Sequence, residues 1–171
     1  MVRDSTAQNC QNLNEIVDYI RPTILIGLSG KKGIFTPKIL QLMAKYNQRP
    51  IVFALSNPEA NAECPFSKAM YYTNNQVIFA SGTSFPDYSI PSSKEIRQNN
   101  QANNMYIFPA LELGILLSKK RIINDFMIYK AAQFLADSLT AEEKRKGYLY
   151  PDLTRIQEVS RQIASKIKSL K

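Results

Sequence analysis

The chain has no histidine and only two cysteines among its 171 residues. Without histidine, these residues cannot form a Ser-His or Cys-His nucleophile pair or an imidazole metal site. Cys10 and Cys64 are far apart in the sequence and have no ligand spacing around them, so we interpret each as a buried or incidental thiol. Catalysis by this chain alone would need Lys, Tyr, Asp or Glu as proton carrier, and none of these stands at a convincing position.

Long apolar runs are also missing. No run approaches the roughly 18 residues of a membrane span, and the N-terminus lacks the charged-then-apolar layout of a signal peptide. The apolar content of 44% and the charged content of 21% are ordinary for a globular protein. The length suits one domain.

Acidic residues are outnumbered 14 to 22, which gives a net charge of +8. This charge could indicate a nucleic-acid partner. However, eight basic residues fall between Lys144 and Lys171, on a predicted helix with a core-facing apolar stripe. The stripe consists of Ile156, Val159, Ile163, Ile167 and Leu170. We interpret the basic residues as a solvated helix face and expect no nucleic acid and no membrane as partner; a basic nucleic-acid-binding module is the alternative that charge alone supports.

Three short apolar runs predict strands, over residues 23–27, 51–57 and 76–82. Each run ends in small polar residues. The run 51–57 is unbroken, as is typical of a strand buried on both faces of a parallel sheet. Because the carboxyl ends of parallel strands share one edge, the three ends should form one crevice, where open α/β sheets bind ligands.

A Gly-rich loop over residues 28–33 follows the first strand. Thr36 is a candidate N-cap, and Pro37 suits the first turn of a helix reaching Tyr46. The order strand, loop, helix, strand predicts an α/β fold with a doubly wound, mostly parallel sheet. The loop lacks the spacing of the dinucleotide fingerprint and of the P-loop, so on its own it reads as a tight turn.

Helix signals dominate the remainder of the chain. Residues 83–102 are polar and turn-rich and are interpreted as a long loop. We expect helices over residues 1–20, 65–72 and 124–139, with capping boxes at residues 140–143 and 154–157 opening two more helices.

Five ordered segments together are far more specific than any one of them. They are residues 21–36 (RPTILIGLSGKKGIFT), 49–58 (RPIVFALSNP) with 62–64 (AEC), 79–82 (FASG), 101–109 (QANNMYIFP) and 147–151 (GYLYP). The chain closely resembles the C-terminal part of the NAD(P)-binding domain of malic enzymes, the malate dehydrogenases that also decarboxylate. The resemblance spans residues 12–170.

The resemblance implies an incomplete Rossmann-type sheet over about residues 1–110 and a helical tail over about 111–171. It implies oxidative decarboxylation of malate to pyruvate and CO2 with NAD or NADP, and Mg2+ or Mn2+ in the complete enzyme. It also implies a homo-oligomer, dimer or tetramer, in the cytoplasm or the mitochondrial matrix. The residues it assigns to substrate binding are Asn57, Asn103 and Asn104, and those it assigns to cofactor binding are Leu28, Ser29, Leu55, Ser56, Asn57, Gly82 and Asn103.

Two departures from the family pattern carry predictions. The family's acidic metal ligands, its tyrosine and lysine proton carriers and its Gly-x-Gly-x-x-Gly turn are missing. We therefore assign no catalytic or metal residue and predict that this chain alone is inactive; a non-catalytic nucleotide-binding or assembly relative is the alternative. In addition, Ala102, Ala110 and Glu112 replace family glycines, which would cost of order 1–3 kcal/mol at any position with positive φ.

Overall fold

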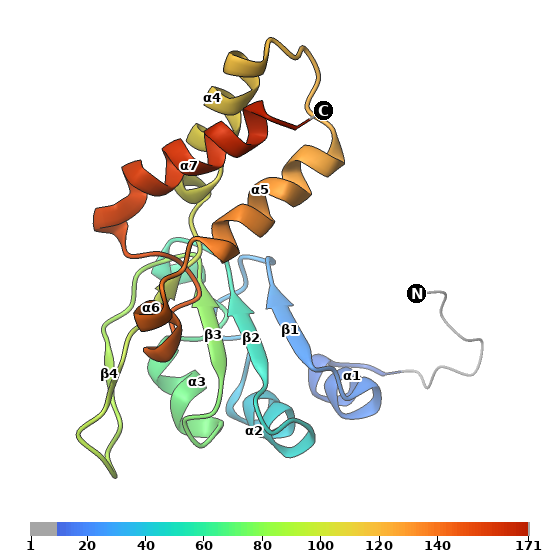
Figure 1. Ribbon diagram of the computed structural model, residues 1–171. Helices are drawn as coiled ribbons and strands as arrows, with labels where there is room; N and C mark the ends of the chain where they lie inside the picture. The colour runs from blue at the N-terminus through green and yellow to red at the C-terminus, as the bar shows by residue number, and fades with distance from the viewer. Residues whose placement is uncertain (1–9, 171) are drawn as a thin grey trace.

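The structure, a computed structural model, describes residues 10–170 as a parallel sheet followed by a helical tail (Figure 1). The sheet order is β1-β2-β3-β6, and every neighbouring pair is parallel. The strands are β1 (Ile24–Gly27), β2 (Ile51–Ala54), β3 (Ile78–Ser81) and β6 (Asn100–Gln101). The predicted fold class is confirmed: an incomplete Rossmann-type α/β sheet with a C-terminal helical tail.

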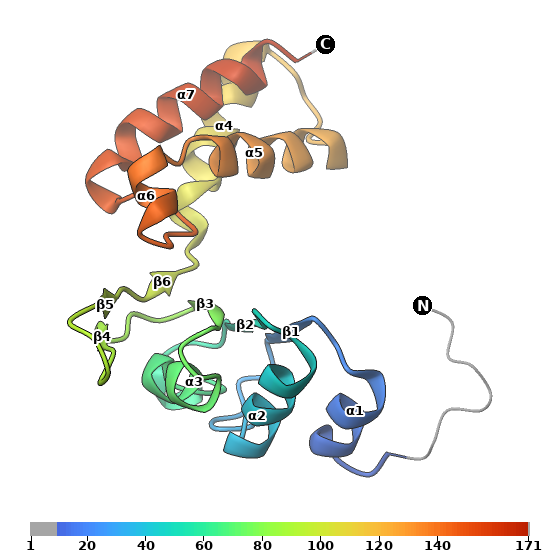
Figure 2. The ribbon, with the colours of Figure 1, turned by 60° about the horizontal axis from the view of Figure 1, so that its bottom comes forward.

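Three helices cover one face of this sheet (Figure 2). They are α1 (Leu13–Ile20), α2 (Pro37–Tyr46) and α3 (Phe66–Tyr72). The N-cap prediction is confirmed, because Thr36 Oγ1 accepts a hydrogen bond from the Ile39 backbone N–H at 3.4 Å. Beneath the strands, α2 buries Ile39, Leu40 and Met43 completely. The part of the predicted first helix over residues 1–9 lies outside the described residues.

The other face of the sheet is open, and the prediction of a strand buried on both faces is wrong. Val52 and Ala54 are fully buried, whereas Ile51 and Phe53 on the opposite face are only half-buried. On β1, Ile24 and Ile26 are 50% and 53% exposed. The physical reason is that α1, α2 and α3 all lie on the same side, and no helix of residues 10–170 packs closely over the other side.

The segment 83–102 is not the loop that its polarity predicts. It contains a short antiparallel hairpin of β4 (Tyr88–Ser89) and β5 (Ile96–Arg97), followed by β6. These strands have two residues each, and β6 is Asn-Gln. Two polar residues carry no hydrophobic alternation, so β6 is held by its pairing with Ala80 and Ser81 of β3.

The helical tail has its own core. It comprises α4 (Phe108–Ser118), α5 (Asp125–Asp137), α6 (Ala141–Arg145) and α7 (Ile156–Lys168). The predicted stripe of α7 is confirmed, with Val159, Ile163 and Ile167 buried. It packs on α4 at Gly114, where an added Cβ would lie only 2.7 Å from Ile167 Cβ. The predicted N-cap Asn124 and the capping box at residues 140–143 are also present.

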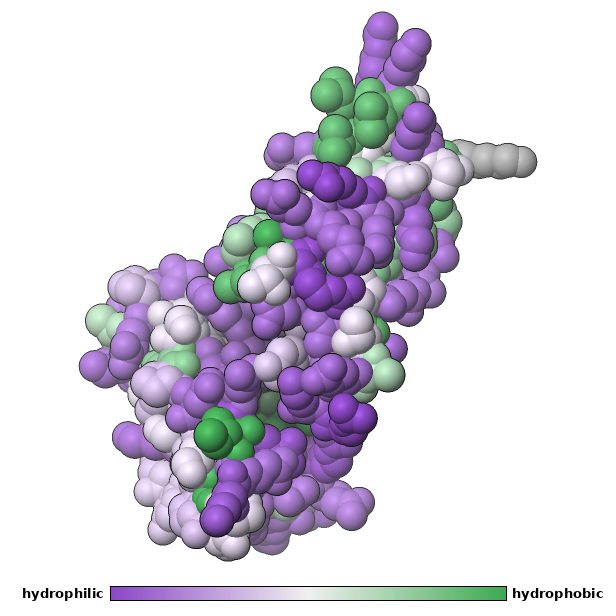
Figure 3. All heavy atoms as spheres, turned by 60° about the vertical axis from the view of Figure 1, so that its left-hand side comes forward, coloured by the Kyte–Doolittle hydropathy of each residue, from purple (hydrophilic) through white to green (hydrophobic). Residues whose placement is uncertain are grey.

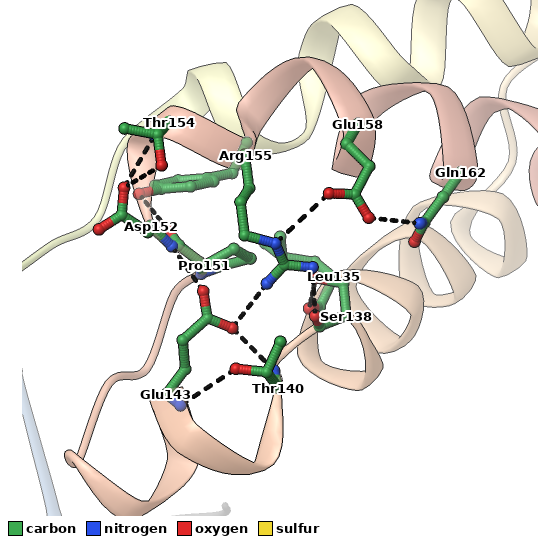
Figure 4. Close-up of polar contacts among 11 residues, drawn as sticks. Leu135, Ser138, Thr140, Glu143, Pro151, Asp152, Thr154, Arg155, Glu158 and Gln162 are labelled. Atoms are coloured by element: carbon green, nitrogen blue, oxygen red, sulfur yellow. Dashed lines mark hydrogen bonds and ion pairs between the residues drawn. The ribbon is translucent and has the colours of Figure 1, made fainter.

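The capping box predicted at residues 154–157 is wrong. Thr154 lies in the short 3-10 helix Leu153–Arg155, whose cap is Asp152: its Oδ1 accepts from the Thr154 N–H at 2.9 Å. Arg155 instead turns toward the preceding helix and pairs with Glu143 at 2.7 Å (Figure 4). This ion pair joins α6 to the 3-10 helix that leads into α7.

The departures from family glycines cause no backbone strain. Ala102, Ala110 and Glu112 are absent from the residues with positive φ among those described. Ala110 is fully buried in α4, and Glu112 is exposed on the same helix. Within residues 10–170, no helix has the length and apolar character needed to cross a bilayer.

Candidate functional site

The carboxyl ends of the strands meet at one edge of the sheet, facing the helical tail (Figure 1). The ladder continues one residue past the strands: the Leu55 N–H donates to Gly27 O, the Gly82 N–H to Ala54 O, and the Ala102 N–H to Ser81 O, at 2.8–3.0 Å. Neighbouring strands lie about 4.8 Å apart, so the segments leaving β2 and β6 start about 10 Å apart. Asn57 and Asn103 follow within three residues of these points and share this edge.

Both of these asparagines are exposed. Asn103 caps the 3-10 helix Asn104–Tyr106, because its Oδ1 accepts from the Met105 N–H at 3.0 Å. That bond fixes the amide with its NH2 group as the remaining donor. Asn104 is exposed beside it. The edge therefore presents neutral amides, which suit a carboxylate or a ribose hydroxyl.

A buried carboxylate, Glu63, lies beneath the loops that follow β1 and β2. It is completely inaccessible to solvent. Its oxygens accept from the Ser29 N–H at 3.3 Å, from the Ser56 N–H at 3.2 Å and from the Ser56 hydroxyl. Ser56 Oγ in turn accepts from the Gly30 N–H at 2.9 Å. Glu63 thus ties the loop after β1 to the end of β2.

Two glycines make this close approach possible. An added Cβ on Gly27 would lie 2.5 Å from Glu63 Cγ, and one on Gly82 would lie 2.1 Å from the backbone oxygen of Leu55. Neither position has room for a methyl group. The strand ends can converge only because these residues lack side chains.

Glu63 is a site residue that has no role in the predictions made from the sequence. The available signal was its setting: an acidic residue between Ala62 and Cys64, two residues of the kind that is often buried. Both neighbours are in fact buried. Burial, and next the negative charge of Glu63, raise the pKa of Cys64 to about 12, so this thiol is protonated at neutral pH. The predicted buried thiol is confirmed for Cys64, and Cys10 is a half-buried free thiol.

The predicted cofactor residues occupy the ends of β1, β2, β3 and β6. Leu28 is 75% exposed, Ser29 and Asn57 are exposed, and Leu55 and Gly82 are half-buried. The Ser56 side chain is buried and faces Glu63. Gly30 and Gly33, in the loop after β1, have φ of +66° and +70°, a left-handed backbone conformation that glycine adopts without strain.

A divalent metal does not fit the described residues. They contain no group of three or more His, Cys, Asp or Glu side chains that could hold an ion. A dinucleotide fits in part, because exposed amides and glycine-shaped loops converge on one edge. These residues suit the parts of a dinucleotide that accept hydrogen bonds, and they do not suit a metal ion.

Comparison with known proteins identifies the family of this chain. The family described as "Malic enzyme, NAD binding domain" matches residues 2–170. The "NADP-dependent malic enzyme" of Columba livia is 41% identical over 162 residues, covering 94% of this chain and 29% of that protein. The "NAD-dependent malic enzyme 2, mitochondrial" of Arabidopsis thaliana is 40% identical over 154 residues, covering 90% and 25%. The chain spans less than a third of these relatives, and over that span it belongs to the malic enzyme family through the NAD-binding domain.

Proposed function

We propose that the carboxyl edge of the sheet binds the nicotinamide side of NAD or NADP together with malate. The observation that carries the proposal is the presence of Asn57 and Asn103 at one edge, with the loop of Asn57 tied to the loop after β1 by Glu63. Neutral amides can hold an anionic substrate and a ribose without changing the local charge. The relatives are named for both NAD and NADP, so the proposal covers either dinucleotide.

Each residue has a distinct part in this proposal. The Asn103 NH2 group donates to a carboxylate of malate, and Asn104 lies next to it. Asn57 donates to substrate and ribose from the end of β2. Leu28, Ser29 and Gly82 line the cofactor side, and Leu55 and Ser56 set the loop between them. When bound, the dinucleotide supplies a hydride acceptor.

In the complete enzyme, we propose the reaction of malate and NAD(P)+ to give pyruvate, CO2 and NAD(P)H. The metal ion, Mg2+ or Mn2+, and the proton carriers then come from residues other than those described. The 171 residues alone are accordingly expected to bind ligands and not to turn malate over. The proposed assembly is a dimer or tetramer, in the cytoplasm or the mitochondrial matrix.

A chimaera tests the proposal. Residues 12–170 replace the matching segment of the Columba livia enzyme, and malate oxidation is followed by NADPH formation. Asn103→Ala should lower kcat/KM for malate about 10- to 100-fold, because a hydrogen bond to a charged group contributes about 1.5–3 kcal/mol. The KM for malate should carry most of this change.

Gln48→Ala is the matched control. Gln48 has an exposed amide side chain just before β2, at the opposite end of that strand from Asn57, so it reports loss of an amide outside the proposed site. Its kinetics should stay within twofold. Equal kinetics for Asn103→Ala and the parent chimaera would remove Asn103 from the substrate site. A chimaera that binds NADPH but never turns over would favour the non-catalytic alternative.

A further inference from the structure

A second cavity of about 290 Å3 lies away from the carboxyl edge, between the start of β3, the β5–β6 segment and α6. Four cationic side chains line it: Arg49, Arg97, Lys144 and Lys146. They come from three separate parts of the chain, and no Asp or Glu is among the lining residues. Figure 3 brings this side of the molecule forward and shows mostly hydrophilic residues across it.

The cations are not fully neutralised. Lys146 pairs with Glu142 at 2.8 Å, and Arg97 Nε lies 3.1 Å from Glu95 Oε1. Arg49 and Lys144 have no ion pair among residues 10–170. Two positive charges are therefore left over at the mouth of one cavity, which favours an anionic occupant.

Two buried polar atoms in the cavity wall have no hydrogen bond among the described residues. Arg97 Nε is buried, and its contact with Glu95 is not aligned as a hydrogen bond. The other is Asn75 Oδ1, an acceptor; with the amide flipped, its NH2 group would take that place as a donor. An unpaired buried donor is costly, and an oxygen of an anion would satisfy Arg97 Nε.

The wall is held in place by the segment after α6. Gly147 has φ +80°, and an added Cβ there would lie 3.3 Å from Arg97 Nη1. The Leu149 N–H donates to Asn100 Oδ1 at 2.7 Å, which fastens the segment to β6. These contacts hold the segment after α6 against β6 and beside Arg97.

We propose that this basic cavity binds a diphosphate group. A diphosphate offers several anionic oxygens to guanidinium and ammonium donors, which form strong charge-assisted hydrogen bonds with phosphate. The volume is near the lower end of the range for small-molecule sites. Free diphosphate and a nucleoside diphosphate share this chemistry. A neighbouring cavity of about 310 Å3, which shares Asn100 and Tyr148, has tyrosine walls that suit a base.

Isothermal titration calorimetry of the 171-residue chain with sodium pyrophosphate and with ADP, at low salt, tests this proposal. Saturable one-site binding is expected. Arg49→Gln combined with Lys144→Gln should weaken it at least tenfold. ADP binding tighter than pyrophosphate identifies the nucleotide as the ligand, and equal affinities identify the diphosphate alone.

The control combines Arg161→Gln with Lys168→Gln, which removes the same net charge from the exposed face of α7. It should change affinity less than twofold. Equal weakening by both double variants, or no saturable binding up to 10 mM ligand, would overturn the proposal. Far-UV circular dichroism checks that each variant is folded.

Discussion

Glu63 is buried with backbone and hydroxyl donors around it in place of a cationic partner. A buried carboxylate is tolerated only when its oxygens are hydrogen-bonded. Here three donors converge on it from two loops, so the negative charge is stabilised by dipoles. The same hydrogen bonds fix the positions of Ser29 and Ser56, at the start of the loops that follow β1 and β2. One residue therefore sets the spacing of two strand ends.

Replacing Glu63 by Gln should lower the free energy of unfolding by about 2–3 kcal/mol. The amide NH2 would face N–H donors at one of the two oxygen positions and leave a buried donor unpaired. Urea denaturation followed by circular dichroism measures the change. Glu59→Gln, an exposed change four residues earlier, should stay within about 0.5 kcal/mol. Equal stability of both variants would show that the Glu63 bonds contribute nothing.

At the scale of elements, the Glu143–Arg155 pair joins α6 to the 3-10 helix that leads into α7 (Figure 4). Glu143 is only 7% exposed. Burial on its own raises the pKa of Glu143, but hydrogen bonds from the Asp152 and Thr140 backbones and from Arg155 outweigh it and lower the pKa from 4.5 to about 2. The folded tail therefore stabilises the charged carboxylate form of Glu143 over its protonated form.

The tail should therefore lose stability in acid. Because the folded pKa of Glu143 is below the unfolded one, its contribution is complete above about pH 4.5 and is lost as the pH falls toward 2. The full shift corresponds to about 3 kcal/mol. Urea denaturation of the chain from pH 6 to pH 2 measures this loss.

Glu143→Gln separates this group from the other carboxyls. The variant should be less stable at pH 7 and should show a shallower decline between pH 4.5 and 2. A parallel decline in parent and variant would mean that other groups carry the acid sensitivity.

Elements with strong local signals were predictable from sequence. Thr36, Asn124 and Thr140 cap helices as expected, because capping depends on residues within one turn. The capping box predicted at residues 154–157 is absent, because a 3-10 helix capped by Asp152 precedes α7. β6 could not be predicted: its two polar residues are a strand only because β3 lies beside them. Glu63 was missed for a similar reason, as its partners lie 7 and 34 residues away in sequence.

At the scale of the whole molecule, the sheet has one covered face and one open face. β1 is an edge strand, and its open face shows Ile24 and Ile26. An apolar edge with unpaired backbone groups is a site for association with another chain.

The 171-residue chain should self-associate through this edge. Ile26→Lys places a charge on it and should shift sedimentation toward monomer, without a large loss of stability, because Ile26 is 53% exposed. Analytical ultracentrifugation at several concentrations measures the shift. Lys32→Ile, which adds apolar surface on an exposed loop beyond β1, should not produce it. A parent chain that is monomeric at all concentrations would contradict the expectation.

The protonated thiol of Cys64 has a practical consequence. It adjoins Glu63 and is shielded from solvent, so alkylating reagents can reach it only when the surrounding loops open. The rate at which Cys64 is alkylated therefore reports how often the loops around Glu63, at the carboxyl edge of the sheet, open to solvent. Any ligand that clamps the strand ends together should slow that modification, which offers a reading of occupancy that requires no turnover.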